Sequence, residues 1–426
     1  MKVDITLPHT IGGQGTNDSG SALQSVETRD YPLLIKYMGS KAGITHFITE
    51  GIKEVYDGGA VCDLFAGACT LSGAIGHSVQ IISNDIQAYS RILAHSYLHR
   101  LTSEAAKLTG KSIIGDAAKI VEGTKSKLPN GLEYPSSPSL DEFNKIEKRN
   151  RSLIELEFSD PYHLFLKSYS GTWWSAEQCV WIDALRRVSD IYLDEGKISE
   201  QDHAILLTCT MHAMAYCGQG TGHYAQYRDA TSGSSLKDIN LYRQKSIAAY
   251  YERKFDALKK WNLENVVDEF DHKLLTLDFE ECLKTLEGGT VYADPPYAFV
   301  HYSRFYHAIE TFVLYDYPEL QIKGGVLVKG RYRENRHQSP FSIRSQVPDA
   351  FERLFKGIRE REANLVLSYS NSGLLDLKEL HDLADQCLNS HYSLSVLNID
   401  HTHMTMGRRG DRDRNVEEAL LLAVHK

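Results

Sequence analysis

The sequence predicts an α/β protein with a Rossmann-like, mostly parallel sheet, an antiparallel closing pair of strands, and a mainly helical insertion. Three observations lead to this fold class. Short apolar runs at 60–64, 79–83 and 289–293 each end at a glycine turn or a carboxylate, as buried parallel strands do. From about 141 to 265, apolar residues recur at helical spacing. Nearer the C-terminus, residues 394–400 and 416–424 alternate in polarity, which predicts an antiparallel pair of strands.

The chain has 426 residues, which is long for a single core, so a second unit is expected. We expect residues 31–122 and 268–426 to form the α/β catalytic unit, 123–267 to form the insertion, and 1–30 to be a flexible polar arm. Glycine, proline and serine are frequent at 123–140, as at a domain boundary. Long helices are predicted at 86–108, 176–195, 198–217, 236–261 and 345–360.

Charge and cysteine content narrow the class of protein. The net charge of −9 argues mildly against a nucleic-acid partner, although local basic tracts matter more than the sum. The seven scattered cysteines contain no C-x-x-C pair, which predicts buried free thiols in a reducing cytoplasm. No apolar run is long enough for a bilayer, so no membrane is expected. His401 and His403 lack partner ligands, so no metal is expected.

The most informative motif is Asp294-Pro295-Pro296-Tyr297, which follows the apolar run at 289–293. A carboxylate and a backbone carbonyl accept hydrogen bonds only, so together they can take both hydrogens of an amino group and turn its lone pair outward. The prolines fix the backbone, and the tyrosine offers a flat face for stacking a base. At average residue usage the tetrapeptide occurs by chance in roughly one such chain per thousand. The alternative is an ordinary turn after a strand.

Two further motifs follow the first two apolar runs. Asp63, Phe65 and Gly67 lie where a strand turns into a helix, and glycine there lets a ligand approach the backbone. Asp85 follows the neighbouring strand about 20 residues on, in the position that grips two ribose hydroxyls. Each feature also has an ordinary explanation, since the first fits a plain βα turn and the second a helix N-cap.

A third motif precedes the first strand. Tyr37, Gly39 and Lys41 belong to a Lys-Tyr-Met-Gly-Ser-Lys segment that could close a pocket over an amino-acid carboxylate. Taken alone, the segment would be better explained as a surface loop. Its place before the other motifs makes a ligand-binding role the better interpretation.

In this order, the motifs resemble the Dam-like class of site-specific DNA adenine-N6 methyltransferases, over roughly residues 33–100 and 270–425. The resemblance implies an S-adenosylmethionine-dependent methyltransferase sheet with a closing hairpin. It also implies that the helical insertion recognises the target. Catalysis would fall to Asp294, Pro295, Pro296 and Tyr297. S-adenosylmethionine would be bound by Tyr37, Gly39, Lys41, Asp63, Phe65, Gly67, Asp85, Asp278 and Phe279. Ala68 and Cys69 depart from the family's commoner Ser-Gly pair.

Three segments carry candidate DNA-binding residues. A basic tract at 329–337 interleaves arginine with tyrosine, asparagine and histidine, and a glycine-rich loop at 218–228 is too polar for a core. The segment 298–307 directly follows the catalytic motif and is rich in aromatic and hydrogen-bonding groups. The candidates are His223, Tyr224, Tyr302, Arg304, Tyr306, Arg331, Arg333 and Arg336.

We therefore expect methyl transfer to the N6 amine of a flipped-out adenine in double-stranded DNA. The alternatives are an adenine in RNA, a protein glutamine amide, or a catalytically silent donor-binding subunit. An intact Asp-Pro-Pro-Tyr argues against the last. No nuclease signature is evident, so a restriction or defence-system partner would be a separate protein.

Overall fold

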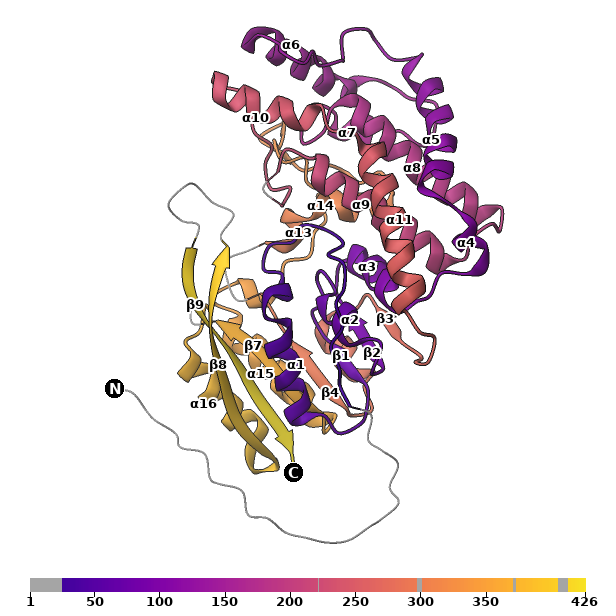
Figure 1. Cartoon of the computed structure of the whole chain (residues 1–426). Coiled ribbons are helices and arrows are strands. Elements are labelled where there is room, and N and C mark those ends of the chain that lie inside the picture. Colours follow the sequence, from indigo (N-terminus) through magenta and orange to yellow (C-terminus); the bar gives the residue numbers. More distant parts are fainter. Residues whose placement is uncertain (1–24, 221, 297–300, 371–372, 405–412) are drawn as a thin grey trace.

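The computed structural model describes residues 25–220, 222–296, 301–370, 373–404 and 413–426. Its main feature is a seven-stranded sheet of order β3-β2-β1-β4-β7-β9-β8 (Figure 1). The strands are β1 (Val61–Asp63), β2 (Ile81–Asn84), β3 (Lys273–Leu275), β4 (Thr290–Ala293), β7 (Asn364–Ser370), β8 (Tyr392–Met404) and β9 (Asp413–His425). A separate small pair consists of β5 (Ile322–Lys323) and β6 (Val326–Leu327).

Five strands of the sheet run parallel, as the buried apolar runs predict. β1 pairs with both β2 and β4, β2 pairs with β3, and β4 pairs with β7, all in parallel. β9 is antiparallel to both β7 and β8. Every residue of β1, β2, β4 and β7 is buried, which explains why these runs lack polar alternation.

Helices cover both faces of the sheet. Neighbouring residues of β1, Val61 and Cys62, belong to two different hydrophobic clusters because successive side chains point to opposite faces. The first cluster includes α1 (Thr45–Val55), α2 (Thr70–Ile75) and α3 (Ala88–Leu98). The second includes α12 (Phe279–Lys284), α15 (Val347–Glu360) and α16 (Leu377–Leu388).

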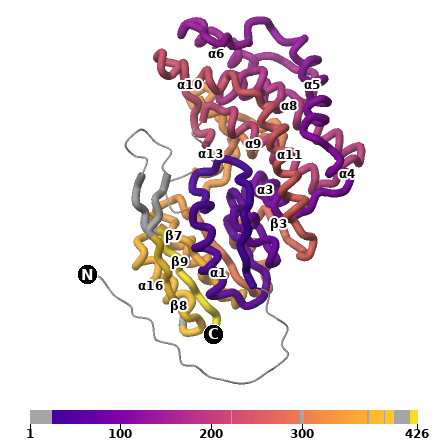
Figure 2. The backbone as a smooth tube through the Cα atoms, viewed as in Figure 1, coloured from indigo at the N-terminus to yellow at the C-terminus, as the bar shows by residue number. Residues whose placement is uncertain are grey.

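A helical part lies beyond one end of the sheet. Figure 2 shows the chain leaving the sheet after α3 and returning at β3. Its helices are α4 (Ser103–Lys107), α5 (Gly110–Lys125), α6 (Leu140–Arg151), α7 (Leu164–Tyr169), α8 (Ala176–Asp194), α9 (Glu200–Cys217), α10 (Gly233–Arg243) and α11 (Ile247–Asn265). It packs on the sheet part through α9 against α3, and through α14 (His307–Leu314). Short elements complete the chain: α13 (Tyr302–Phe305) and four single-turn helices, Lys41–Ile44, Ser152–Glu155, Pro340–Ser342 and Asn389–His391.

Two of the predicted long helices are wrong, because each is broken in the structure. The helix expected at 86–108 ends at Leu98, and α4 begins only at Ser103. The break is held by tertiary contacts: Thr102 donates its backbone N–H and its hydroxyl to the carboxylate of Asp202 on α9. The helix expected at 236–261 is likewise two helices, α10 and α11, with the Ser246 hydroxyl capping the second.

The N-terminal arm was expected to include residues 25–30, but these are packed. Val26 is 2% exposed, and the Arg29 guanidinium donates to the carbonyls of Gly73, Tyr97 and Asn265. Residues 1–24 lie outside the described residues. All seven cysteines are free and buried, as predicted. Among the described helices, none combines the length and apolarity that a membrane crossing requires.

Candidate active site

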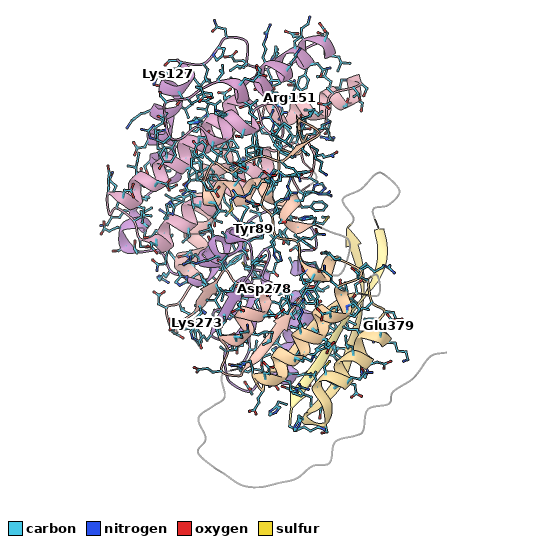
Figure 3. All side chains as sticks on the ribbon, turned by 180° about the vertical axis from the view of Figure 1, so that it is seen from behind. Tyr89, Lys127, Arg151, Lys273, Asp278 and Glu379 are labelled. Atoms are coloured by element: carbon cyan, nitrogen blue, oxygen red, sulfur yellow. The ribbon has the colours of Figure 1, made fainter. Side chains whose placement is uncertain are left out.

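A pocket opens at the carboxyl ends of β1, β2 and β4, where open α/β sheets bind ligands. Its floor comes from the loops after these strands, and its walls come from the segment before α1 and from α13. Seen from behind, Tyr89 and Asp278 lie close to where the helical part meets the sheet, and both line the pocket (Figure 3).

The loops that form the floor are joined by one amide side chain. Asn84, at the end of β2, donates through Nδ2 to the carbonyls of Leu64 (3.2 Å) and Leu277 (3.1 Å). Its Oδ1 accepts from the N–H of Leu277 (3.0 Å). Asn84 is 1% exposed, so these bonds are shielded from water. The strand ends of β1, β2 and β3 are thereby fixed to one another.

Gly67 and Asp85 meet at this edge of the sheet. Gly67 has φ +51°, and a Cβ added there would come within 3.0 Å of the Tyr37 hydroxyl, so glycine is required for both reasons. Its N–H donates to Asp85 Oδ2 (2.9 Å), and the N–H of Gln87 donates to Oδ1 (2.9 Å). Burial raises the pKa of Asp85, and the two backbone donors oppose that rise.

Asp63 is a buried carboxylate at the pocket floor. It is 2% exposed, and its Oδ1 has no hydrogen-bond partner among the described residues. Burial raises its pKa well above 3.8, and the nearby carboxylates of Asp294 and Asp85 raise it further. An acceptor left unpaired inside a pocket is costly unless a ligand donates to it.

One end of the pocket is lined by aromatic rings. The ring centroids of Phe65 and Phe279 lie 6.0 Å apart, and Phe341 packs edge-on against both, at 5.5 and 5.2 Å. Asp278 caps α12 by accepting from the N–H of Glu280 (3.0 Å). This end offers a flat apolar slot beside a carboxylate, which suits a heteroaromatic ring carrying an amino group.

Lys41 lies between two carboxylates. Its Nζ is 3.3 Å from Asp294 Oδ1 and 3.2 Å from both carboxylate oxygens of Glu418 on β9. Lys41 is 5% exposed, Asp294 17% and Glu418 0%, so the three charges are shielded from solvent. The ammonium group favours ionised carboxylates on both sides. The ion pairs thus direct Lys41 toward Asp294, which differs from the expected contact with an amino-acid carboxylate.

Three tyrosines stack at the pocket wall. The ring centroid of Tyr37 lies 4.5 Å from that of Tyr306 and 6.0 Å from that of Tyr302, with interplanar angles of 14° and 22°. The Tyr306 hydroxyl accepts from the N–H of Met38 (2.6 Å). A Cβ on Gly39, at φ +77°, would lie 3.0 Å from the Tyr302 hydroxyl. The segment before α1 and α13 therefore form one packed wall.

The structure brings most of the predicted ligand-binding residues together. Pro295 and Pro296 line the pocket beside Asp294. Tyr297 lies outside the described residues. Every predicted donor-binding residue lines this one pocket: Tyr37, Gly39, Lys41, Asp63, Phe65, Gly67, Asp85, Asp278 and Phe279.

The DNA-binding candidates divide into exposed and buried residues. Arg304 is exposed and Arg336 is half-buried, and they adjoin Ser303 and His337, which line the pocket. His223 stacks on Phe305 (4.6 Å between ring centroids). Arg333 is engaged in an ion pair with Asp316 (2.6 Å). Three candidates lie in the interior with exposed fractions of 5% or less, so they are not surface contacts: Tyr224, Tyr306 and Arg331.

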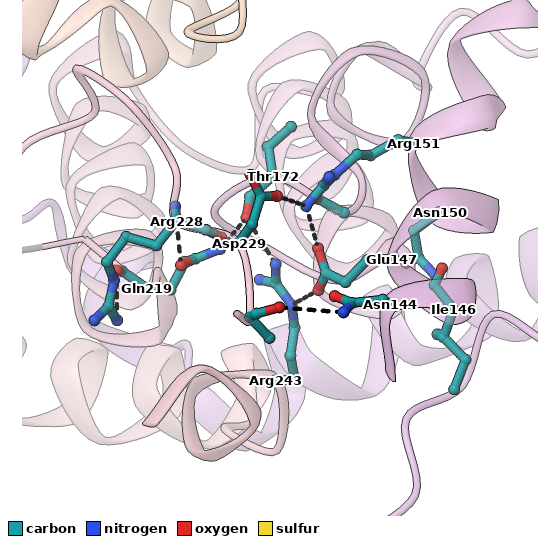
Figure 4. A network of polar contacts seen from close by, with 12 residues as sticks. Asn144, Ile146, Glu147, Asn150, Arg151, Thr172, Gln219, Arg228, Asp229 and Arg243 are labelled. Carbon is teal, nitrogen blue, oxygen red and sulfur yellow. Dashed lines mark hydrogen bonds and ion pairs between the residues drawn. The ribbon is translucent and has the colours of Figure 1, made fainter. Parts of the chain in front are cut away.

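A network of ion pairs, buried at Glu147 and Arg243, extends to Asp229 at the end of the glycine-rich loop after α9 (Figure 4). Glu147 on α6 accepts from Arg243 Nε and Arg151 Nη2, each at 2.8 Å. Arg151 also pairs with Asp229, at the end of the loop (2.9 Å). Glu147 is 3% exposed, and removal of either arginine would leave it partly unpaired. The loop's far end is therefore fixed to the helical part.

Sequence reasoning missed several residues of the site. Glu418 had one available signal, since it is the carboxylate that directly precedes the apolar run 419–424 of β9. Glu310 on α14 accepts from the N–H groups of Ala88 and Tyr89 and so caps α3. Gln87, His337, Ser339 and Pro340 line the pocket without any sequence motif. The described part of the chain contains no group of three or more side chains placed to hold a metal.

Comparison with known proteins agrees with these motifs. Residues 37–159 match the family model described as D12 class N6 adenine-specific DNA methyltransferase, so this part of the chain is similar to that class. The resemblance predicted from the motifs is thereby confirmed. A methyltransferase of that class requires a methyl donor.

The curated relatives are modification enzymes. Modification methylase LlaI of Lactococcus lactis subsp. lactis is 25% identical over 351 residues, which cover 82% of this chain and 48% of LlaI. Type II methyltransferase M.FokI of Planomicrobium okeanokoites is 25% identical over 368 residues, covering 84% and 47%. Type II methyltransferase M.NlaIII of Neisseria lactamica is 23% identical over 360 residues, covering 83% and 88%. The chain spans about half the length of LlaI and M.FokI.

Proposed function

We propose that the protein transfers a methyl group from S-adenosylmethionine to the N6 amine of a flipped-out adenine in a specific duplex DNA sequence. One observation carries the proposal: Asp294, Pro295 and Pro296 line the same pocket as Asp63 and Asp85. The acceptor for an amino group thus lies beside a site built for a nucleoside. The family match and the curated relatives support this function.

The residues present fit S-adenosylmethionine. The unpaired Oδ1 of Asp63 suits the donor's cationic amino group, and Asp85 suits its ribose hydroxyls. The aromatic slot of Phe65, Phe279 and Phe341 suits its adenine. Asp294, Pro295 and Pro296 line the same pocket, so an extruded base that reached them would lie beside the donor. When bound, this donor supplies a methyl group on a sulfonium, an electrophile that needs no activation.

The chain's own part in the reaction is to prepare the amine. The Asp294 carboxylate and the Pro295 carbonyl accept the two amino hydrogens of adenine, which frees the nitrogen lone pair from the ring. Asp294 takes up the proton that the amine loses. Tyr297 stacks on the extruded base. Lys41 keeps Asp294 ionised, and Glu418 holds Lys41 in place, so Glu418 is a positioning residue.

The target-recognition part is proposed to be the helical insertion, residues 123–267, with the exposed face around the pocket mouth. Arg304 and Arg336 adjoin residues that line the pocket, and His223 lies on the glycine-rich loop, whose end is held by the ion pair of Arg151 with Asp229. Fixed side chains beside the pocket can contact the bases that flank the extruded adenine. The protein is proposed to act in the cytoplasm, and a restriction or defence partner, if present, is a separate chain.

Two experiments test the proposed function. Long-read sequencing of DNA from a host that expresses the chain should show N6-methyladenine at one recurring sequence motif. Transfer of radiolabelled methyl groups should be seen with duplex DNA and not with RNA or bulk protein. Label that appears on RNA or on glutamine amides, with none on DNA, would contradict the proposed substrate.

Asp85→Ala is expected to weaken S-adenosylmethionine binding by about 10- to 100-fold, because a charge-assisted hydrogen bond contributes roughly 1.5–3 kcal/mol. Isothermal titration calorimetry measures this change directly. Asp85→Asn keeps one acceptor oxygen and should lose less affinity. Unchanged affinity in Asp85→Ala would remove Asp85 from the proposed donor site.

Asp63→Asn is expected to stabilise the ligand-free protein at neutral pH, by about 1 kcal/mol, the order of a buried unsatisfied group. The pKa of Asp63 is raised in the folded protein, so its carboxylate ionises later there than in the unfolded chain. Ionisation therefore favours unfolding, and wild-type stability falls as pH rises from about 4 through the folded pKa.

The gain in melting temperature of Asp63→Asn over wild type should thus be present at pH 7.5 and small at pH 4.5. The same substitution should weaken donor binding, because the donor's cationic amino group would lose its charged partner. A gain that is equal at both pH values would show that charge is not its cause.

A further inference from the structure

A cluster of cations surrounds three tyrosines near the end of α9 and the start of α11. We call the basic–aromatic patch the set Lys36, Tyr216, Tyr242, Lys245, Tyr250 and Arg253. Arg253 is exposed, and the other five are half-buried with part of each side chain open to solvent. The cluster is unusual in a chain whose net charge is −9.

Each cation of the patch lies over an aromatic ring. Lys36 Nζ is 4.4 Å from the ring centroid of Tyr216, and Lys245 Nζ is 4.2 Å from that of Tyr242. The Arg253 guanidinium is 4.8 Å from the ring of Tyr250. Tyr216 and Tyr250 stack on one another, with centroids 5.8 Å apart. The rings hold the cations in fixed positions while their charges stay accessible.

The patch contains an excess of positive charge. In the part of the chain that the structure describes, no carboxylate forms an ion pair with Lys36, Lys245 or Arg253, although many exposed lysines elsewhere, such as Lys107, Lys119 and Lys284, pair with one. Burial lowers the pKa of Lys36, and the charge of Lys245 lowers it further. Clustered like charges are unfavourable by themselves, so their presence indicates an anionic partner.

The patch adjoins the pocket. Lys36 directly precedes Tyr37, which lines the pocket wall. Lys245 Nζ donates to the carbonyl of Tyr216 (2.9 Å), near the end of α9. The loop that follows α9 carries His223 onto Phe305 of α13, whose first residues, Tyr302 and Ser303, line the pocket. A bound polyanion that reaches the mouth would therefore pass this surface.

We propose that the basic–aromatic patch binds backbone phosphates of duplex DNA on one side of the extruded adenine. The inference rests on the proposed function and assigns it a second contact surface, separate from the residues at the pocket mouth. Three cations spread over two stacked tyrosines suit a line of phosphates, since such contacts position the duplex without reading its sequence.

The test compares two triple variants of equal charge. Lys36→Gln, Lys245→Gln and Arg253→Gln together change the formal net charge from −9 to −12, that is, −9 minus 3. The control triple Lys107→Gln, Lys119→Gln and Lys284→Gln makes the same change at exposed ion pairs outside the patch. Duplex affinity is measured by fluorescence polarisation between 50 and 200 mM salt, and donor binding by calorimetry.

The patch variant should bind duplex DNA at least about tenfold more weakly at 50 mM salt, and its salt slope should fall by about 2–3, close to 0.9 per lost phosphate contact. Donor affinity should stay as in wild type. If the triple variant folds poorly, Lys36→Gln with Arg253→Gln leaves the Lys245 bond intact and should lose about two contacts.

If the patch and control variants had equal salt slopes and equal affinities, the proposed phosphate contact of the patch would be contradicted. The proposed function would still stand. Wild-type protein that methylates no duplex DNA and shows no salt-dependent affinity for it would overturn both. Sequence-dependent loss, confined to the modified motif and absent on unrelated duplexes, would also overturn the patch, because phosphate contacts weaken binding uniformly.

Discussion

Asp294→Ala is expected to lower kcat for methyl transfer by about 10³-fold or more, with S-adenosylmethionine affinity near that of wild type. The loss follows because the carboxylate accepts an amino hydrogen only as the nitrogen becomes nucleophilic, so the contact acts on the transition state. Single-turnover transfer of a radiolabelled methyl group to the modified duplex measures kcat. Calorimetry measures donor binding separately.

Two control variants distinguish a loss of catalysis from a loss of folding. Asp382→Ala removes an exposed carboxylate that pairs with Lys378 on α16, so it should leave both quantities unchanged. Asp294→Asn keeps an acceptor oxygen without the charge and should fall between wild type and Asp294→Ala. Turnover by Asp294→Ala within tenfold of wild type would refute the proposed role of Asp294.

Lys41→Met is expected to lower kcat at pH 7 by about 10²-fold or more, an effect that higher pH should partly reverse. Without its ammonium group, Asp294 and Glu418 lose the cation between them, and the pKa of Asp294 rises. A protonated Asp294 carries its own O–H and accepts the amino hydrogen less well than a carboxylate does. Activity should therefore return only as the pH rises through the new pKa of Asp294. The pH profile of kcat from 6 to 9 tests this sign.

A double variant makes the same prediction sharper. Lys41→Met with Glu418→Gln removes one charge of each sign, so the repulsion on Asp294 is relieved. The double variant should recover about tenfold of the activity lost in Lys41→Met, a coupling of about 1.4 kcal/mol in the cycle. Melting curves of all three variants check the fold, because breaking a buried pair alone costs about 3–5 kcal/mol. Losses that simply multiply, with a flat pH profile, would contradict the charge-balance mechanism.

The parallel strands and the pocket residues were predictable because they depend on local signals. A buried strand reads as a short apolar run, and its ligand-binding carboxylate or glycine follows directly in sequence, as with Asp63 and Gly67. The chain order of the motifs then gave the family. These features need no knowledge of distant contacts.

Other features depended on contacts between distant segments. The break after Leu98 requires Asp202, which lies 100 residues from Thr102. Glu418 meets Lys41 across 377 residues, so no local pattern pairs them. Tyr306 and Arg331 were chosen for their polar, aromatic surroundings, yet both find partners inside the protein: Tyr306 bonds to Met38, and Arg331 to the carbonyl of Ser168. Such long-range pairs decide which polar residues remain at the surface.

The neighbouring positions of β2 and β3 have a consequence for how such enzymes diversify. Asn84 and Leu275 are direct partners in the sheet, although the whole helical part lies between them in the chain. The helical part therefore leaves and re-enters the sheet at adjacent strands, and the sheet's hydrogen bonding does not depend on what is spliced between them. Under the proposed function, exchanging this segment between relatives would change which DNA is held while the chemistry proposed for Asp294 stays in place.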